Sequence, residues 1–191
     1  MAKRKIPEVL TQEEQQQLIN IFNTRYFTSF RNRTMIKLFL ASGLRLSEMI
    51  NLRWKDINLM TGQLKVVEGK GYKDRILWIS ESIVEELRTW KDKQTQKLDI
   101  CEYVFTTSSR SKLNDRNVRR MISQYSERAG ITKRMSPHIF RHTFASDLLR
   151  DTKNIRLVQK ALGHSDLSTT MIYTHIVDSE LESALKRLRD Y

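Results

Sequence analysis

Six side chains in this sequence have the chemistry needed to bind a phosphodiester and break it. They are two arginines, a lysine, two histidines and a tyrosine, namely Arg45, Lys70, His138, Arg141, His164 and Tyr173. An arginine fork can hold two phosphate oxygens, and a lysine or a histidine can supply or remove a proton. A deprotonated phenol can attack phosphorus and form a covalent intermediate. We therefore predict covalent phosphodiester cleavage, provided that the fold brings these distant residues together.

Each of these residues, taken singly, also has a simpler interpretation. Arg45 could form a local ion pair with Glu48, and Lys70, between two glycines, could be an ordinary hairpin-turn lysine. His164 follows Gly163 and could be a loop histidine after a helix C-cap. Tyr173 could be a half-buried aromatic residue of the core. The prediction therefore depends on the joint pattern.

A metal site is the alternative interpretation of the histidines. His138 and His142 are four residues apart on an expected helix and could share one face. The zinc-protease motif requires a glutamate directly after the first histidine, but Ile139 stands there. The sequence offers no third ligand at a suitable spacing. We therefore predict no metal and no other cofactor.

Composition favours a nucleic-acid partner. The 191 residues include 34 Lys and Arg against 22 Asp and Glu, for a formal net charge of +12. Such an excess indicates a polyanionic partner, and the basic residues are spread along the chain rather than gathered in a membrane anchor. The N-terminus lacks the apolar stretch of a secretory signal, and Cys101 is the single cysteine, so no intrachain disulfide can form. We predict a soluble, cytoplasmic protein that binds double-stranded DNA.

Hydrophobic periodicity predicts a mainly α protein with a small three-stranded antiparallel sheet. Thr11 and Glu14 have the spacing of a capping box, which should begin the first helix. Turn residues around positions 61–62 and 69–72 separate three short strand patterns. Further helices are expected at 30–41, 47–52, 81–93, 115–129, 137–150, 155–162, 168–173 and 179–189, and strands at 57–59, 64–67 and 75–79.

The ordered motifs resemble the catalytic domain of the tyrosine recombinase family, which includes phage integrases and Xer-type resolvases. Five separated blocks carry the resemblance, at residues 7–14, 42–48, 69–75, 136–142 and 162–175. The resemblance covers nearly the whole chain and implies the tyrosine recombinase catalytic-domain fold. It also implies the activity of a site-specific recombinase of a bacterial, phage or mobile-element type, which integrates, excises, inverts or resolves DNA.

The resemblance assigns a role to each of the six residues. Arg45 and Arg141 would hold the non-bridging oxygens of the scissile phosphate, and His164 would complete this clamp. Tyr173 would be the nucleophile that forms a 3′-phosphotyrosyl bond. His138 would be its base, and Lys70 would protonate the departing 5′-oxygen. Glu48 would be a supporting acidic residue near the first arginine.

The resemblance also shapes the expected organisation. Most members carry a further N-terminal core-binding domain, whereas only six residues precede the catalytic pattern here. The sequence fits either an excised catalytic domain or a short, single-domain member of the family. We expect one catalytic domain over 1–191, with a basic arm at 1–10 and a C-terminal helix at 177–191. In similar proteins that C-terminal region packs onto a neighbouring subunit, so we expect a tetramer on DNA and a monomer in its absence. Without a second domain on the other face of the duplex, the protein should contact fewer phosphates and bind DNA weakly, with strong dependence on salt.

The role of one surface and three rival functions remain open on the sequence. A basic run on one expected helix could contact DNA or could simply be solvated. The rivals are a relaxing enzyme of the type IB topoisomerase kind, a DNA-binding regulator without cleavage, and a metal-dependent hydrolase. All six positions hold chemically competent residues, which argues against a decayed site. The basic run consists of Lys112, Arg116, Arg119 and Arg120.

Overall fold

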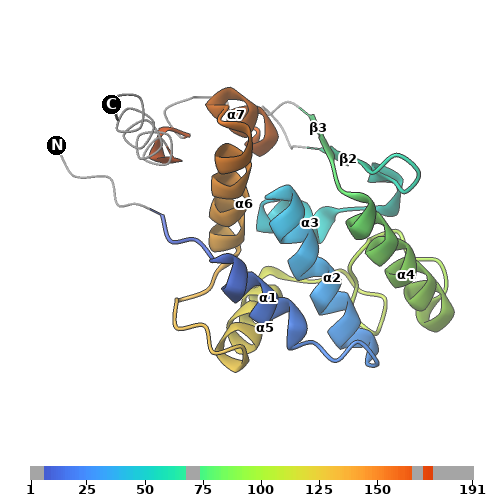
Figure 1. The fold of residues 1–191 in the computed structure, drawn as a ribbon. Coiled ribbons are helices and arrows are strands. Elements are labelled where there is room, and N and C mark those ends of the chain that lie inside the picture. Colours follow the sequence, from blue (N-terminus) through green and yellow to red (C-terminus); the bar gives the residue numbers. More distant parts are fainter. Residues whose placement is uncertain (1–6, 68–73, 165–169, 174–191) are drawn as a thin grey trace, which may run out of the picture.

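The computed structural model of the protein describes residues 7–67, 74–164 and 170–173. Within this part of the chain the fold is mainly α-helical with one small sheet, as predicted (Figure 1). The elements, in chain order, are α1 (Gln12–Asn20), α2 (Phe27–Ser42), α3 (Leu46–Asn51), η1 (Trp54–Asp56), β1 (Ile57–Asn58), β2 (Gln63–Val66), β3 (Arg75–Trp78), α4 (Glu81–Leu98), α5 (Asp115–Arg128), α6 (Pro137–Thr152), α7 (Ile155–Leu162) and η3 (Met171–Tyr173).

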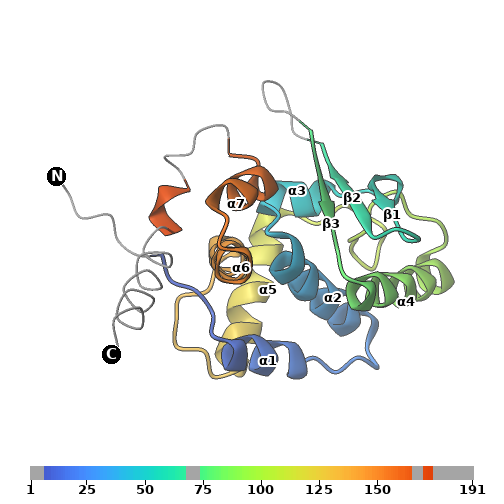
Figure 2. The same cartoon turned by 45° about the horizontal axis from the view of Figure 1, so that its top comes forward.

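Helix α2 is the central element of the main core. It packs against α4 on one side and α6 on the other, as Figures 1 and 2 show. The rings of Phe39 on α2 and Phe140 on α6 stack at a centroid distance of 5.6 Å. Both side chains are fully excluded from solvent. Burial of such aromatic side chains supplies much of the hydrophobic stabilisation. The packed pair of helices α2 and α6 therefore holds in place the residues that follow the C-terminal end of α2.

The sheet lies on the α4 side of α2 and has the antiparallel order β1-β2-β3 (Figure 2). Leu64 pairs with Leu77, and Val66 pairs with Arg75. Residues on each strand alternate between buried and exposed, so one face of the sheet rests on the core. The register therefore turns Arg75 inward together with the apolar residues.

Most predicted boundaries hold within one or two residues, and two helices are longer than expected. The Thr11 hydroxyl accepts a hydrogen bond from the Glu14 backbone N–H at 3.2 Å, which confirms the capping box. Helix α2 begins at Phe27, earlier than predicted, and α4 continues to Leu98. The polar end of α4 gave no periodic signal, but Gln94 is buried there and donates to the backbone oxygen of Val104 at 3.2 Å. The expected helix at 179–189 lies outside the described residues. Of the one expected at 168–173, residues 170–173 are described, and Met171–Tyr173 form the short 3-10 helix η3.

Gly43 ends α2 and allows α6 to approach. Its φ of 60° is left-handed, and its N–H donates to the backbone oxygen of Phe39 at 3.0 Å. A Cβ on this residue would lie 2.3 Å from a ring carbon of Phe144. A side chain at this position would therefore be strained and would displace the Phe144 ring. This close approach brings the start of α3 to α6.

A second, smaller core lies between α6, α7 and η3. It contains Ala145, Leu149, Val158, Leu162 and Tyr173, all buried.

None of the described helices is both long and apolar enough to cross a membrane.

Candidate active site

Glu48 sits between two arginines at the N-terminal end of α3. Its carboxylate accepts hydrogen bonds from Nη1 of Arg45 at 2.8 Å and from the Arg45 backbone N–H at 2.7 Å. Arg75 donates to the other side of the same carboxylate, through Nη1 at 3.0 Å and Nη2 at 2.8 Å. Burial alone would raise the pKa of Glu48, but the hydrogen bonds and charge of Arg75, and then those of Arg45, lower it to about 2. Glu48 is therefore a permanent anion that orients both guanidiniums.

Arg141 projects from α6 into a cage of backbone oxygens. Its Nη1 donates to the carbonyl of Gly43 at 2.7 Å, and its Nη2 donates to the carbonyl of Leu162 at 2.6 Å. Neutral carbonyls hold the guanidinium in place without cancelling its charge. Burial and the charge of Arg45 lower the pKa of Arg141 to about 10, so the group stays cationic at neutral pH.

His164 contacts Arg141 directly and has a defined tautomer. Its Nε2 lies 3.1 Å from Nη2 of Arg141, and its Nδ1 lies 3.0 Å from the Thr170 hydroxyl. A guanidinium can only donate, so Nε2 must be the acceptor and the ring proton is on Nδ1. Burial and the charge of Arg141 lower the pKa of His164 to about 4. The imidazole is therefore neutral at physiological pH.

These groups form a strongly electropositive cluster. Three guanidiniums (Arg45, Arg75 and Arg141) face one carboxylate (Glu48), which leaves a formal charge of +2 when His164 is neutral. In a partly desolvated site such a charge attracts a dianionic or monoanionic phosphate group more strongly than in water. The cluster is thus built to hold an anion of phosphate size.

Tyr173 lies next to this cluster but its phenol is buried. The side chain is 1% exposed, and its hydroxyl lies 2.6 Å from Nδ1 of His142. Burial raises the pKa of Tyr173 to about 12, and burial also lowers the pKa of His142. A protonated phenol thus meets a neutral imidazole that can accept its proton. The backbone N–H of Tyr173 donates to the carbonyl of Thr170 at 3.1 Å, so the tyrosine and His164 are linked through one residue.

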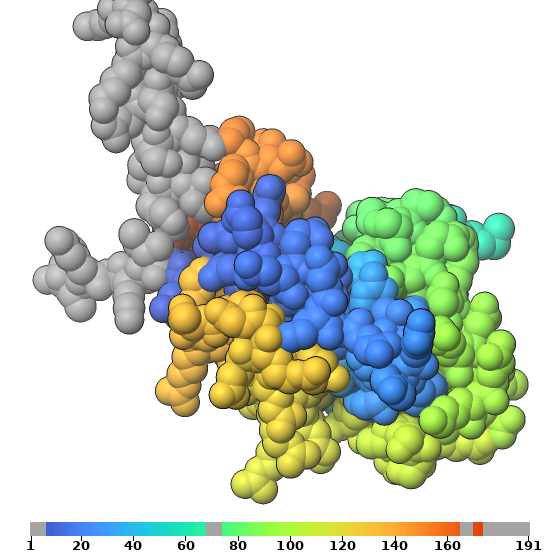
Figure 3. All heavy atoms as spheres, turned by 60° about the horizontal axis from the view of Figure 1, so that its bottom comes forward, coloured from blue at the N-terminus to red at the C-terminus, as the bar shows by residue number. Residues whose placement is uncertain are grey.

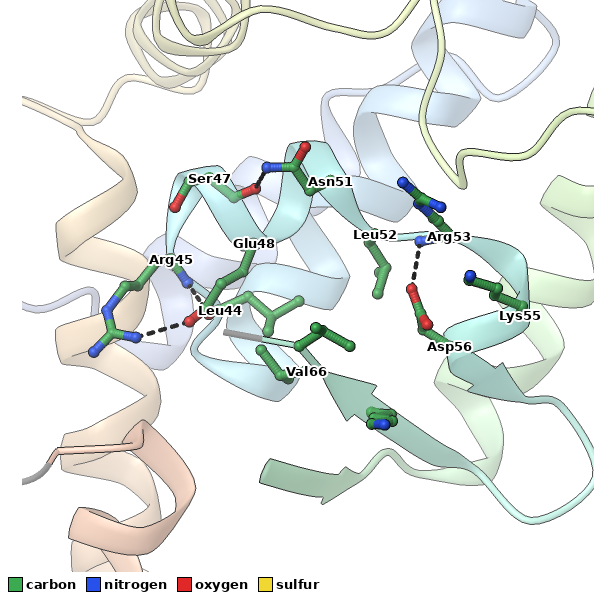
Figure 4. Close-up of a pocket in the computed structure, with 12 residues that line it drawn as sticks. Leu44, Arg45, Ser47, Glu48, Asn51, Leu52, Arg53, Lys55, Asp56 and Val66 are labelled. Atoms are coloured by element: carbon green, nitrogen blue, oxygen red, sulfur yellow. Dashed lines mark hydrogen bonds and ion pairs between the residues drawn. The ribbon is translucent and has the colours of Figure 1, made fainter. Parts of the chain in front are cut away.

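A groove of about 760 Å³ extends from the cluster along α3 and β2. Figure 4 shows Arg45 and Glu48 at one end of it and Arg53, Lys55 and Asp56 at the other. The guanidinium of Arg45 points toward α6 rather than into the far end of the groove.

Comparison with known proteins places these features in a family. A model of the phage integrase family matches residues 8–180. The chain belongs to this family. A curated tyrosine recombinase XerD of Staphylococcus saprophyticus subsp. saprophyticus is 38% identical over 181 residues, which cover 93% of this chain and 61% of the relative. The chain therefore spans about three fifths of that relative's length.

Solved structures agree with this assignment. XerA recombinase superposes with a TM-score of 0.83 at 32% identity, over 98% of this chain and 67% of the other. The XerH site-specific recombinase, bound to its palindromic difH substrate in a post-cleavage complex, gives a TM-score of 0.81 at 29% identity, over 95% of this chain and 53% of the other. The tyrosine recombinase catalytic-domain fold predicted from the sequence is confirmed.

The structure brings four of the six predicted residues together. Arg45, Arg141 and His164 share the cluster, and Tyr173 adjoins it. Glu48 lies where the family resemblance implies, beside Arg45. Lys70 lies outside the described residues. His138 is exposed at the start of α6, and the hydrogen bond of the Tyr173 hydroxyl goes to His142 instead of His138.

The sequence patterns assign no catalytic role to Arg75 or His142. His142 follows Arg141 directly, and its spacing from His138 suggests only a metal ligand; no group of three possible metal-ligating side chains occurs in the described part of the chain. The strand pattern at 75–79 makes Arg75 no more than the first residue of a strand. The alternation of the strand places Arg75 on its buried face, and this could have indicated a role for Arg75, because a buried charge needs a partner.

The predicted basic run lies at and before α5. Lys112, Arg116, Arg119 and Arg120 are all exposed, while Val118 and Met121 on the same helix are buried. Figure 3 shows α5 (yellow) on the outer surface beside α1 (blue). The four cations are therefore available for contact with DNA, and that role remains a prediction.

Proposed function

We propose that this chain is the catalytic part of a tyrosine-type, site-specific recombinase that cleaves and rejoins DNA strands. The observation that carries the proposal is the meeting of Arg45, Arg141 and His164, from three distant segments, beside a buried tyrosine. A net charge of +12 favours a polyanionic substrate, and the XerH relative was solved with DNA bound.

Arg45 and Arg141 would hold the two non-bridging oxygens of the scissile phosphate. The Tyr173 oxygen would attack phosphorus in line, forming a 3′-phosphotyrosyl bond as the bond to the 5′-oxygen breaks. Fixed guanidiniums stabilise the charge that develops in the transition state, as metal ions do in other phosphoryl-transfer enzymes. His164 donates its only ring proton to Thr170, so it would need to gain a proton at Nε2, or change tautomer, in order to donate to the phosphate.

Two protons must move in this step. The Tyr173 proton passes to a base, for which the family resemblance implies His138 and for which the described contact offers His142. The departing 5′-oxygen takes a proton, which Lys70 would supply. The phosphotyrosyl bond keeps the energy of the broken diester, so attack by a second 5′-hydroxyl would rejoin the strands without ATP. A tetramer assembled on DNA would allow exchange between two sites.

Covalent capture of DNA tests this proposal. Nicked duplexes trap the intermediate because the short 5′-hydroxyl fragment diffuses away after cleavage. A pool with randomised sequence around the nick allows the target to be recovered from the adduct. We expect a denaturant-resistant protein–DNA adduct with the wild type and none with Tyr173→Phe.

Tyr26→Phe is the matched control, because Tyr26 is 68% exposed and lies on the loop before α2. Its adduct yield should equal that of the wild type. An adduct on Tyr173→Phe would place the nucleophile elsewhere. A wild type that binds DNA but forms no adduct on any member of the pool would instead favour a non-cleaving regulator.

A further inference from the structure

Arg75 is a buried arginine whose three side-chain nitrogens each donate a hydrogen bond to a directed partner. Its side chain is 6% exposed, and that of Glu48 is 7% exposed. Two of its nitrogens hold both carboxylate oxygens of Glu48, and its Nε donates to the backbone oxygen of Ala161 at 2.9 Å. Burial of a guanidinium is costly unless such partners meet it, and this fork-to-fork geometry is the strongest kind of pairing. Arg75 therefore links two separate elements, α3 through Glu48 and α7 through Ala161, and is held in place by both.

The two arginines on Glu48 differ in their access to a ligand. The Arg45 side chain is 35% exposed, about six times more than that of Arg75. Arg45 can thus reach a phosphate, whereas Arg75 is covered by protein. Glu48 connects them, since each of its oxygens accepts a hydrogen bond from Arg75 and one also accepts from Arg45 Nη1.

The third partner of Arg75 leads to the other half of the cluster. Ala161 and Leu162 are consecutive residues at the C-terminal end of α7, where helix carbonyls carry partial negative charge. The Ala161 carbonyl accepts from Arg75, and the next carbonyl, that of Leu162, accepts from Arg141. Arg75 therefore ties α3, with Arg45, to the helix end that holds Arg141.

We propose that Arg75 is a positioning residue for strand cleavage: by binding Glu48 and the end of α7 together, it sets the spacing of Arg45 and Arg141 to fit the scissile phosphate. The inference rests on the proposed function. Arg75 also shares the charge of Glu48 that would otherwise be directed wholly at Arg45. Its loss would leave a one-to-one ion pair between Glu48 and Arg45, which competes with the phosphate for the Arg45 fork.

Arg75→Met and Arg75→Lys test this inference, with Arg33→Met as the matched control. Arg33 forms a 3.0 Å ion pair with the nearly buried Glu86 between α2 and α4, so its loss removes a comparable pair that none of the proposed phosphate-binding residues shares. The measurement is the single-turnover rate of adduct formation at saturating nicked DNA. We expect a loss of about 10²-fold for Arg75→Met, as for removal of one oxyanion-hole donor, and little change for Arg33→Met.

A change of substrate charge separates positioning from a general loss of structure. A methylphosphonate at the scissile position removes one anionic oxygen and so reduces the demand for two correctly spaced arginines. The defects of Arg75→Met and of Arg45→Ala should both shrink on this substrate, by about 10-fold or more. A defect in Arg75→Met of equal size on both substrates, or no larger than that of Arg33→Met, would overturn the inference.

Arg75→Lys covers the case in which the methionine variant does not fold. Lysine keeps the charge but cannot hold two carboxylate oxygens and the Ala161 carbonyl together, so adduct formation should still be slow. A wild-type rate in Arg75→Lys would also count against the inference.

A measurement without DNA keeps the inference separate from the proposed function. Inorganic phosphate added to the wild type should shift the ring resonances of His164, and Arg75→Lys should need a higher phosphate concentration for the same shift. If the wild type binds phosphate more tightly than Arg75→Lys but forms no adduct with any DNA, the proposed function fails, while the role of Arg75 in shaping the phosphate-binding cluster is supported. Equal phosphate affinity in Arg75→Lys and the wild type would refute the positioning role alone.

Discussion

The Tyr173 hydroxyl lies 2.6 Å from Nδ1 of His142, one residue beyond Arg141 on α6. The phenol is buried and its pKa is raised to about 12, so the described state holds the proposed nucleophile protonated. The proposed attack on phosphorus therefore requires that this proton pass to a base, and the described contact places His142 within reach of it.

A double-mutant cycle will measure the Tyr173–His142 hydrogen bond. His142→Phe keeps an aromatic ring at the site but leaves the buried phenol without its acceptor, which costs about 1–3 kcal/mol. Tyr173→Phe removes the hydroxyl itself, so the double variant should be more stable than the sum of the two losses predicts. Denaturant unfolding of the four proteins gives the coupling energy, expected at about 1 kcal/mol. Strict additivity would show that the contact does not form in solution.

Alkaline titration will test the raised pKa of Tyr173. The group's pKa is higher in the folded protein than its usual value of 10.0, so folding favours the neutral phenol. The resulting stability is present below pH 10 and is lost as pH rises toward about 12, by up to roughly 3 kcal/mol. Difference absorbance of the phenolate in the wild type and in Tyr173→Phe isolates this residue. A Tyr173 transition at its ordinary pKa would contradict its burial.

Acid titration will test the environment of His164. Its pKa is lowered from 6.5 to about 4, so folding favours the neutral ring. This contribution to stability is present above pH 6.5 and is lost as pH falls toward about 4. Histidine NMR should show His164 titrating near that lower limit, and Arg141→Met should raise its pKa because a neighbouring positive charge is gone. No change in Arg141→Met would mean that the charge of Arg141 does not contribute to the lowered pKa.

Arg141→Lys will test the need for a guanidinium at the phosphate. A lysine ammonium cannot reach the Gly43 and Leu162 carbonyls and still present a planar fork to phosphate oxygens. We expect adduct formation to fall by at least about 10²-fold. Arg150→Lys on the same helix is the control, because Arg150 forms an exposed i,i+3 pair with Asp147. Full activity of Arg141→Lys would remove the bidentate clamp from the mechanism.

Salt dependence will test the four cations at α5. Binding to duplex DNA should weaken steeply with salt, because each neutralised phosphate contributes about −0.9 to the slope of log affinity against log salt. Arg116→Ala and Arg120→Ala should each reduce the steepness by about 1 if they contact phosphates. Arg88→Ala, which removes an exposed arginine of α4 paired with Glu81, should leave the slope unchanged. A flat plot for the wild type would contradict DNA binding through charge.

The elements of the fold were largely predictable because their signals are local. The capping box at Thr11 and Glu14, the apolar spacing of α2 and the Pro137 start of α6 each act within a few residues. The predicted α4 was too short because its end is held by a contact distant from the local pattern. There the Gln94 side chain donates to the backbone of Val104, in a segment packed against the helix.

The order of residue types along the chain was enough to identify the family and to name Arg45, Arg141, His164 and Tyr173 as candidates. What those residues contact follows from the folded structure alone. Arg141 meets a carbonyl 98 residues away, and Arg75 meets one 86 residues away. Such contacts follow from how helices pack and not from any local spacing. The contact of Tyr173 with His142 and the position of Arg75 beneath Arg45 and Arg141 therefore became visible only in the folded chain. The same holds for the protonation states of these site residues.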